Sequence, residues 1–292
     1  MFGCLSARIK QLRSQGRLRT AETYVAALRS FRDFRSGADV PLASMDTALA
    51  EAYEAHLRGR GNSLNTVSFY MRILRAAYNR AVREGITQQR HPFRYVYTGI
   101  AKTVKRALPL AVIREINALD LTQEPSTDFA RDMFMLSFFL RGMSFIDMAM
   151  LRKSDLQGGY LRYCRRKTGQ RLSVQWTVAM QRIVDKYPAN RTPYLLPIIT
   201  GAAADPRRAY LTVSGRVNRH LKLIGERVGL AAPLTMYCAR HSWASVARAE
   251  GIPLAVISEG LGHDSEATTR IYLAALDSAA VDRANAQILA AL

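Results

Sequence analysis

Apolar residues recur every three or four positions through the first part of the chain, which is the spacing of amphipathic helices. In residues 19–37, Tyr24, Leu28 and Phe31 fall on one stripe, and the segment closes at a glycine. Residues 41–61 repeat the pattern and also end in glycines. Both segments are therefore predicted to be helices with one buried face.

The longest periodic segment covers residues 62–85 and is predicted to be a single helix. Ser63 or Asn65 can cap its start, because both side chains accept hydrogen bonds from free main-chain N–H groups. Its expected buried stripe consists of Val67, Tyr70, Leu74, Ala77, Tyr78 and Ala81. The next residues, 85–109, contain Gly and Pro and little periodicity, which is typical of a linker between two domains.

The rest of the chain combines helices with one predicted β-hairpin. Residues 160–166 and 172–176 alternate between apolar and polar positions around the turn sequence KTGQ, which is the pattern of two paired strands. Alternate side chains of a strand share a face, and one face here carries Leu161, Tyr163, Arg165 and Lys167. Helical patterns lie at 109–119, 128–144, 177–187, 212–228, 239–250 and 253–260, and an amphipathic tail covers 278–292.

Charge narrows the expected partners, because the 292 residues include 42 Lys and Arg against 23 Asp and Glu, a net charge of +19. The chain is also 49% hydrophobic, which indicates a folded protein rather than a disordered one. This excess favours a polyanionic partner, with nucleic acid ahead of an anionic membrane surface. No apolar run reaches the roughly 18 residues that span a bilayer, so we expect no membrane partner.

Clustered cations indicate where phosphates are expected to bind. Arg72, Arg75 and Arg83 project from a second sector of the predicted 62–85 helix, and few acids accompany them. This pattern favours phosphate contact over an ordinary solvated face. The linker adds the cations Lys102, Lys105 and Arg106. A solvated connector without phosphate contacts is an equal alternative interpretation of this segment.

Cysteine and histidine usage predicts neither disulfides nor a metal site. Cys4, Cys164 and Cys238 are far apart without any C-x-x-C pair, and the five histidines are not paired at ligand spacing. The first residues become basic before any apolar region develops, unlike a secretory signal. We therefore expect a cytoplasmic, reduced protein without metal or cofactor.

Three short motifs in the second half carry candidate chemistry. The hairpin tip contains Lys167, residues 237–245 read YCARHSWAS, and residues 261–272 read LGHDSEATTRIY. The last motif places Tyr272 nine residues after His263. Alone, it would be interpreted as a loop, a helix cap and a half-buried aromatic residue.

In this order, the motifs resemble the tyrosine recombinases, also called the phage integrase family, and the resemblance covers nearly the whole chain. It implies that Tyr272 is the nucleophile, Arg240 the arginine of the family's His-x-x-Arg box, His263 a second active-site histidine and Lys167 the hairpin lysine. The helical N-terminal region is similar to the family's SAM-like core-binding domain. The wording of residues 141–151 and 237–245 is most similar to a Bacteroides-type branch.

Two positions depart from the family pattern. Tyr237 stands where the box histidine is expected, with His241 beyond Arg240, and its hydroxyl could bond to phosphate or hold Arg240. Ser144 aligns with the family's first arginine, for which Arg141 and Arg165 are the nearest replacements. Arg165 is slightly favoured, because it shares a strand face with Lys167.

The family's chemistry accounts for these residue types. A phenolate attacking a phosphodiester needs cations around the oxygens where charge develops, and arginine contacts two such oxygens at once. A lysine near the leaving 5′ oxygen can donate a proton, and a covalent phosphotyrosine conserves the bond energy without ATP or metal. On one straight helix His263 and Tyr272 would lie roughly 13 Å apart. The chain must therefore bend between them, and Asp264 and Ser265 can cap a new helix.

The resemblance implies a mainly α protein with a small β-sheet. It would comprise a helical core-binding domain with a basic linker at 1–104 and a mixed α/β catalytic domain at 105–292, together forming a C-shaped clamp on double-stranded DNA. The C-terminal helix is expected to pass to a neighbouring subunit in a tetramer, and packing on its own domain is the alternative. Accessory proteins that bend the DNA are further expected partners. The start of the chain close to the first helix favours inversion or simple integration.

Two other functions compete with recombination. A DNA-binding architectural protein of this fold that has lost cleavage would explain the substitutions at Ser144 and Tyr237. A type IB topoisomerase would share the chemistry. Retention of Lys167, Arg240, His263 and Tyr272 argues against the first, and the amphipathic tail against the second.

Overall fold

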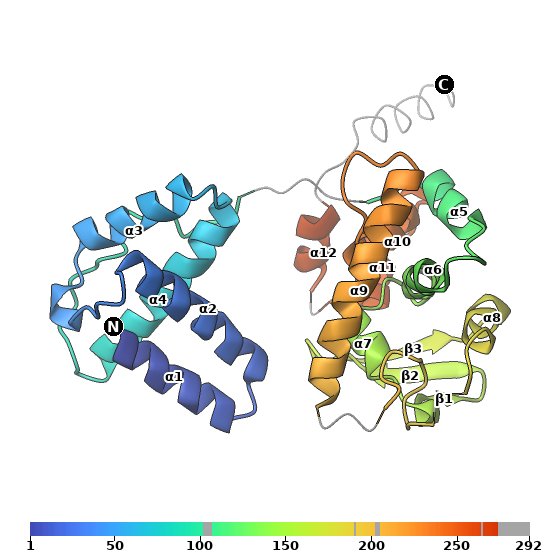
Figure 1. The fold of residues 1–292 in the computed structure, drawn as a ribbon, viewed down its shortest axis with the longest axis horizontal. Helices are drawn as coiled ribbons and strands as arrows, with labels where there is room; N and C mark the ends of the chain where they lie inside the picture. The colour runs from blue at the N-terminus through green and yellow to red at the C-terminus, as the bar shows by residue number, and fades with distance from the viewer. Residues whose placement is uncertain (102–106, 190, 202–204, 264, 274–292) are drawn as a thin grey trace. The chain divides into compact units, whose positions relative to one another are not determined.

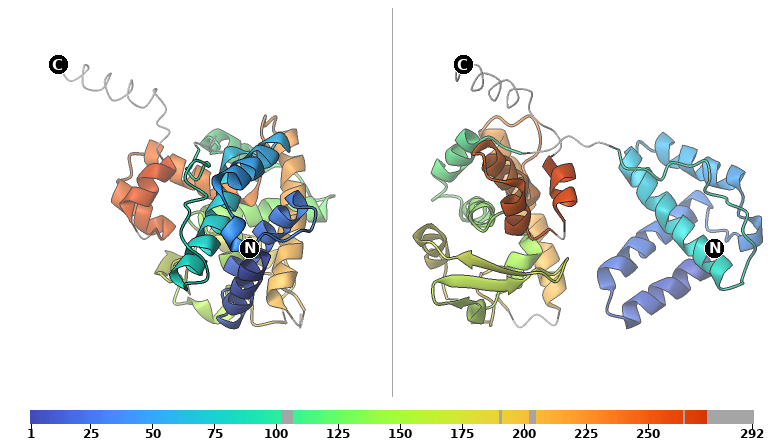
Figure 2. Two further views of the ribbon diagram at one scale, coloured as in Figure 1. Left: turned by 90° about the vertical axis from the view of Figure 1, so that its left-hand side faces the viewer. Right: turned by 180° about the vertical axis from the view of Figure 1, so that it is seen from behind.

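A computed structural model of the chain divides into two compact units, Met1–Thr103 and Val104–Leu292 (Figures 1 and 2). The structure describes residues 1–101, 107–189, 191–201, 205–263 and 265–273. Helices form most of both units, and a small three-stranded sheet lies in the second. The predicted fold class, mainly α with a small β-sheet, is therefore confirmed.

The first unit is a group of helices around an aromatic core. Its elements are α1 (Phe2–Ser14), α2 (Leu18–Phe34), a 3-10 turn (Leu42–Ser44), α3 (Thr47–Gly59) and α4 (Leu64–Arg83). Phe31 of α2 is fully buried and packs edge-on against Tyr53 of α3, with ring centroids 5.0 Å apart. Ser63 caps α4 by accepting a hydrogen bond from Thr66 N, as the sequence predicted.

The helix α1 was not expected from the sequence. Phe2, Leu5, Ile9 and Leu12 are its buried residues, and they recur at helical spacing. The terminal amine of Met1 donates to the main-chain oxygen of Val40 at 2.6 Å, which fixes the start of the chain. The apolar periodicity was present in the sequence, but the surrounding basic residues obscured it.

The predicted linker is wrong for its first part, because residues 86–101 pack on the first unit. Phe93 and Val96 are buried in the core of that unit. Ser68 Oγ donates to the main-chain oxygen of Gly99 at 2.6 Å, and Tyr78 OH donates to that of Gln88 at 2.9 Å. The cluster of Lys102, Lys105 and Arg106 lies outside the described residues.

The second unit combines helices with a small sheet at one edge (Figure 1). The helices are α5 (Leu110–Ala118), α6 (Pro125–Phe139), α7 (Phe145–Ala149), α8 (Val178–Asp185), α9 (Pro206–Arg227), α10 (Met236–Ala249), α11 (Leu254–Leu261) and α12 (Glu266–Leu273), with a 3-10 turn at Lys153–Asp155. The strands are β1 (Leu156–Gln157), β2 (Tyr160–Cys164) and β3 (Arg171–Gln175). The expected C-terminal exchange helix falls in residues 274–292, outside the described part.

The sheet is antiparallel in the order β1-β2-β3, and the predicted hairpin is its β2–β3 pair. Tyr160 pairs with Gln175 and Cys164 with Arg171. This register buries Leu161 of β2 together with alternate residues of β3. The hairpin is thus held by one apolar face, and residues beside its turn lie against Gly262 at the end of α11.

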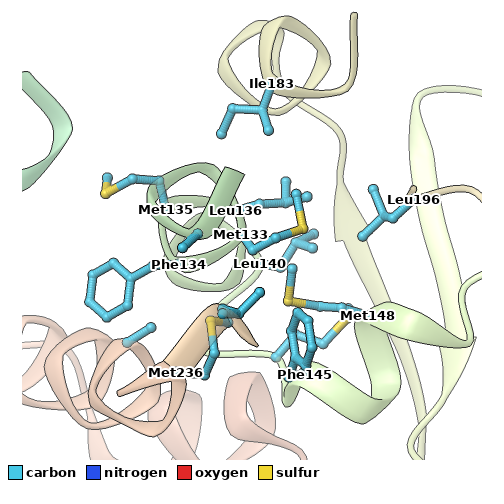
Figure 3. Close-up of a cluster of buried hydrophobic side chains, with 14 of the residues drawn as sticks. Met133, Phe134, Met135, Leu136, Leu140, Phe145, Met148, Ile183, Leu196 and Met236 are labelled. Carbon is cyan, nitrogen blue, oxygen red and sulfur yellow. The ribbon is translucent and has the colours of Figure 1, made fainter. Parts of the chain in front are cut away.

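The core of the second unit forms around α6 (Figure 3). Met133, Phe134 and Leu136 are fully buried on different sides of this helix, which explains why its sequence is apolar nearly all round. Met148 from α7 and Met236 from α10 complete the cluster in the close-up. In the part of the chain that the structure describes, no helix combines the length and apolar character needed to cross a bilayer.

Candidate active site

Arg240 of α10 is a buried cation of the candidate site, and several hydrogen bonds fix its guanidinium. Its side chain is buried, with 5% of the residue exposed. Nη1 donates to the main-chain oxygen of Gly142 at 2.9 Å, and Nη2 donates to that of Leu261 at 2.6 Å. Nη2 also lies 3.1 Å from His263 Nε2. A buried guanidinium requires such partners, because an unpaired charge there would be strongly destabilising.

Gly142 makes the close approach of α6 and α10 possible. It follows α6 in the left-handed region, with φ 72°, which glycine adopts without strain. A Cβ at this position would lie 2.6 Å from Arg240 Cα. The glycine therefore lets its own carbonyl reach the guanidinium, and sequence reasoning did not identify it.

His263 lies at the break between two helices, as the motif spacing predicted. The helix α11 ends at Leu261, its C-cap Gly262 turns the chain with a φ of 62°, and α12 begins at Glu266. Ser265 Oγ accepts a hydrogen bond from Thr268 N at 3.4 Å and so caps the new helix. Asp264, the other expected cap, lies outside the described residues, and Tyr272 belongs to α12.

Arg165 joins Arg240 and His263 from the hairpin. It directly follows β2, is 7% exposed, and donates from Nη1 to the main-chain oxygen of Gly262. The predicted alternation holds through Arg165, but β2 ends at Cys164, and Lys167 lies exposed in the turn. The structure therefore brings together Arg165, Arg240 and His263, and it does not bury Lys167 with them.

The phenol of Tyr163 lies near several charged side chains of this cluster. Burial and the charge of Asp147 raise the pKa of the Tyr163 phenol to about 12, while the charges of Arg240, Arg165 and Arg141 oppose that increase. All three arginines therefore act on one half-buried phenol, which sequence reasoning did not single out. Its position on the apolar face of the hairpin was the available signal.

Both candidates for the displaced arginine thus lie near the cluster, but their environments differ. Arg141 follows α6 in the left-handed region, with φ 59°, and is partly exposed. Ser144, at the aligned position, caps α7 by accepting from Asp147 N at 3.3 Å and donates to Asp147 Oδ2 at 2.6 Å. The Ser144 hydroxyl therefore caps a helix, and it cannot supply the positive charge of the family's first arginine.

Tyr237 lines a cavity beside the cluster. It is 58% exposed, and its ring packs edge-on against His241, with centroids 4.5 Å apart. The cavity has a volume of about 340 Å³, and Ser144, Tyr237 and Arg240 are among its lining residues. The site is thus open on the side where the family pattern has its two substitutions.

The predicted DNA-binding arginines of the first unit occupy α4. Arg72 and Arg83 are exposed, and Arg75 is half-buried with Nη1 3.1 Å from Thr98 Oγ1. Within the described residues, no three His, Cys, Asp or Glu side chains lie together as metal ligands could.

Comparisons with known proteins identify the family to which this fold and this cluster belong. Residues 1–97 match the phage integrase SAM-like domain, and residues 112–279 match the phage integrase family. The chain belongs to this family, that of the tyrosine recombinases, which are DNA strand-transferring enzymes.

Individual relatives agree with that assignment. Tyrosine recombinase XerD of Halalkalibacterium halodurans is 25% identical over 264 residues, which cover 87% of this chain and 84% of that protein. A lambda integrase tetramer bound to a Holliday junction has a TM-score of 0.72 at 20% identity, covering 92% of this chain and 76% of that one. The Tn1549 transposon integrase, in complex with circular intermediate DNA, has a TM-score of 0.69 at 16% identity, covering 98% of both chains. The two structural similarities show a shared fold.

Proposed function

We propose that this protein is a site-specific recombinase that cleaves and rejoins double-stranded DNA through a covalent 3′-phosphotyrosine at Tyr272. The observation that carries the proposal is the group of two buried arginines, Arg240 and Arg165, with the half-buried His263, at the turn that leads into the helix of Tyr272. Buried cations held by main-chain carbonyls are pre-organised for a phosphate on which negative charge develops.

Each residue has a chemical role in this proposal. Arg240 and Arg165 stabilise the charge on the phosphorane, and Arg141 is the alternative second arginine. Lys167 protonates the leaving 5′ oxygen from the exposed hairpin turn. Tyr237, which lines the cavity, bonds to a phosphate oxygen in place of the usual histidine.

DNA is the proposed partner of both units. In the first unit Arg72, Arg75 and Arg83 contact phosphates, and His241 does so in the second. The net charge of +19 supports many such contacts. Lys102, Lys105 and Arg106 are proposed as further phosphate contacts.

The assembly and biological setting are proposed from the relatives. The lambda integrase neighbour is a tetramer on a Holliday junction, which supports a tetramer with exchange of C-terminal segments here. The Tn1549 transposon integrase supports a role in a mobile element, through integration, excision or inversion of DNA in the cytoplasm.

A suicide-substrate experiment tests the proposal. A duplex selected by the protein from a random pool is nicked near its centre, so that cleavage traps the covalent complex. The wild type should give an SDS-resistant adduct, and Tyr272→Phe should bind the duplex equally well without one. Binding without any adduct in the wild type would favour the architectural protein, and an adduct in Tyr272→Phe would place the nucleophile elsewhere. Relaxation of supercoiled DNA without strand exchange would favour a topoisomerase.

A further inference from the structure

A chain of hydrogen bonds connects α12 to the buried guanidinium of Arg240. Thr269 Oγ1 of α12 lies 2.8 Å from His263 Nδ1, and His263 Nε2 lies 3.1 Å from Arg240 Nη2. Arg240 in turn donates to the main-chain oxygens of Gly142 and Leu261. Thr269 is fully buried although it is polar, so its hydroxyl is committed to contacts inside the protein.

The partners of the imidazole define which nitrogen carries the proton. A guanidinium has only donors, so His263 Nε2 must accept the hydrogen bond from Arg240 Nη2. In the neutral imidazole the proton is then on Nδ1, which donates to Thr269 Oγ1. Thr269 is therefore the acceptor that stabilises this tautomer.

Among the described residues, α12 also makes apolar and main-chain contacts with the rest of the unit. Leu273 is buried in a small cluster with Ala244, Ile257 and Leu261. Arg248 Nη1 donates to the main-chain oxygen of Leu273 at 3.2 Å. The hydrogen bond of Thr269 is the described contact that joins α12 directly to the His263 ring.

We propose that Thr269 is a positioning residue that couples the placement of α12 to the state of the arginine–histidine cluster. When α12 is docked, Thr269 holds the His263 ring with Nε2 facing Arg240. Tyr272 follows Thr269 by three residues on the same helix, so the same docking brings the backbone of the nucleophile to the site. This inference rests on the proposed recombinase function.

Two substitutions at this position separate the hydroxyl from the shape of the side chain. Thr269→Val keeps the branched shape and removes the acceptor, whereas Thr269→Ser keeps the acceptor. Thr268→Val is the matched control, since Thr268 is the adjacent, exposed residue of the same helix and its hydroxyl contacts Ser265. Circular dichroism establishes that each variant is folded.

Single-turnover cleavage of the nicked duplex gives the first measurement. Loss of one buried hydrogen bond should slow adduct formation about tenfold in Thr269→Val, with unchanged DNA affinity. Thr269→Ser and Thr268→Val should cleave within about twofold of the wild type. An equal loss in Thr269→Ser, or a wild-type rate in Thr269→Val, would overturn the proposal.

The ring nitrogens of His263 give a second measurement, which does not depend on cleavage. In protein labelled with ¹⁵N histidine, with the signals assigned through His263→Gln, the wild type should show a protonated Nδ1 and an unprotonated Nε2. Thr269→Val should weaken this preference, because Nδ1–H loses its acceptor while Arg240 still favours an unprotonated Nε2. A protonated Nε2 in the wild type would refute the inference even if every variant failed to fold. Absence of an adduct in the wild type would instead refute the recombinase function.

Discussion

Arg165 donates a hydrogen bond to the main-chain oxygen of Gly262, the residue directly before His263. The fit between them is tight, because a Cβ on Gly262 would lie 3.1 Å from Arg165 Cδ and 2.8 Å from Leu172 Cδ1. The hairpin and the turn between α11 and α12 are thus packed directly against each other. This contact places a second buried guanidinium beside His263.

The contact leads to a prediction about the displaced arginine of the family pattern. Arg165→Ala should slow single-turnover cleavage about 100- to 1000-fold, the usual cost of losing one group that stabilises the transition state. Arg141→Ala should cost only a few-fold, because Arg141 is partly exposed. Gel-shift measurements should show that both variants still bind the duplex.

A rescue variant sharpens this test. Ser144→Arg restores a guanidinium at the family position, and in the Arg165→Ala background it should recover part of the cleavage rate. A large loss in Arg141→Ala alone would assign the role to Arg141. If neither alanine variant lost more than a few-fold, the site would work with Arg240 as its single essential arginine.

Gly142 provides a prediction with a closely matched control. Gly142→Ala should slow cleavage by more than tenfold, because its Cβ would lie 2.6 Å from Arg240 Cα and 2.9 Å from Arg240 Cγ. Gly158→Ala introduces a side chain at a similar positive φ, 56°, with nothing within 4 Å. It should therefore cost about 1–2 kcal/mol of stability and leave the cleavage rate unchanged.

The two glycine variants are compared by urea unfolding and by cleavage of the nicked duplex. The prediction is specific to the displacement of Arg240, since backbone strain is common to both substitutions. Equal cleavage by the two proteins would show that the Gly142–Arg240 contact does not control the site.

The raised pKa of Tyr163 predicts that the stability of the protein depends on pH in the alkaline range. The Tyr163 pKa is raised to about 12 by burial, while an unfolded tyrosine titrates near 10. Between these values the folded state binds more protons than the unfolded state, so stability should fall as the pH rises from 10 to 12. The full difference corresponds to roughly 2.7 kcal/mol.

Urea unfolding at pH 9 and pH 11 measures this effect. Tyr163→Phe should lose less stability over that interval than the wild type, because it lacks the phenol whose pKa is raised. Tyr160→Phe removes an exposed phenol from the same strand and should behave as the wild type does. Identical pH dependence in all three proteins would contradict the assignment of the effect to Tyr163.

Periodicity predicted most of the fold, because most elements bury one face. The β2–β3 alternation and the α4 stripe, apart from the half-buried Tyr70, were identified because burial imposes a period of 3.6 or 2 on the sequence. Residues 86–101 have no such period, since they pack through single side chains such as Phe93 and through hydrogen bonds such as Ser68 to Gly99. A pattern-based prediction therefore assigned them to a linker.

The site was predictable where motif spacing fixes the geometry. The Gly262–His263 turn and the new helix that carries Tyr272 follow from the short distance required between two groups on one phosphate. The contact of Gly142 with Arg240 was not predictable, because it depends on how the turn after α6 meets α10 in three dimensions. Such pairs have no characteristic separation along the chain.

The proposed phosphate contacts of α4 predict how DNA affinity depends on salt. The logarithm of the association constant should fall linearly with the logarithm of the salt concentration, with a slope set by the number of phosphates neutralised. Arg72→Ala and Arg83→Ala, which remove exposed cations of α4, should each reduce the magnitude of that slope by about one. Arg19→Ala is the control, because Arg19 is an exposed α2 cation paired with Glu22 at 3.3 Å. Fluorescence anisotropy with a labelled duplex, from about 50 to 200 mM salt, measures the slopes. A slope that α4 variants leave unchanged would mean that this helix face does not touch the DNA backbone.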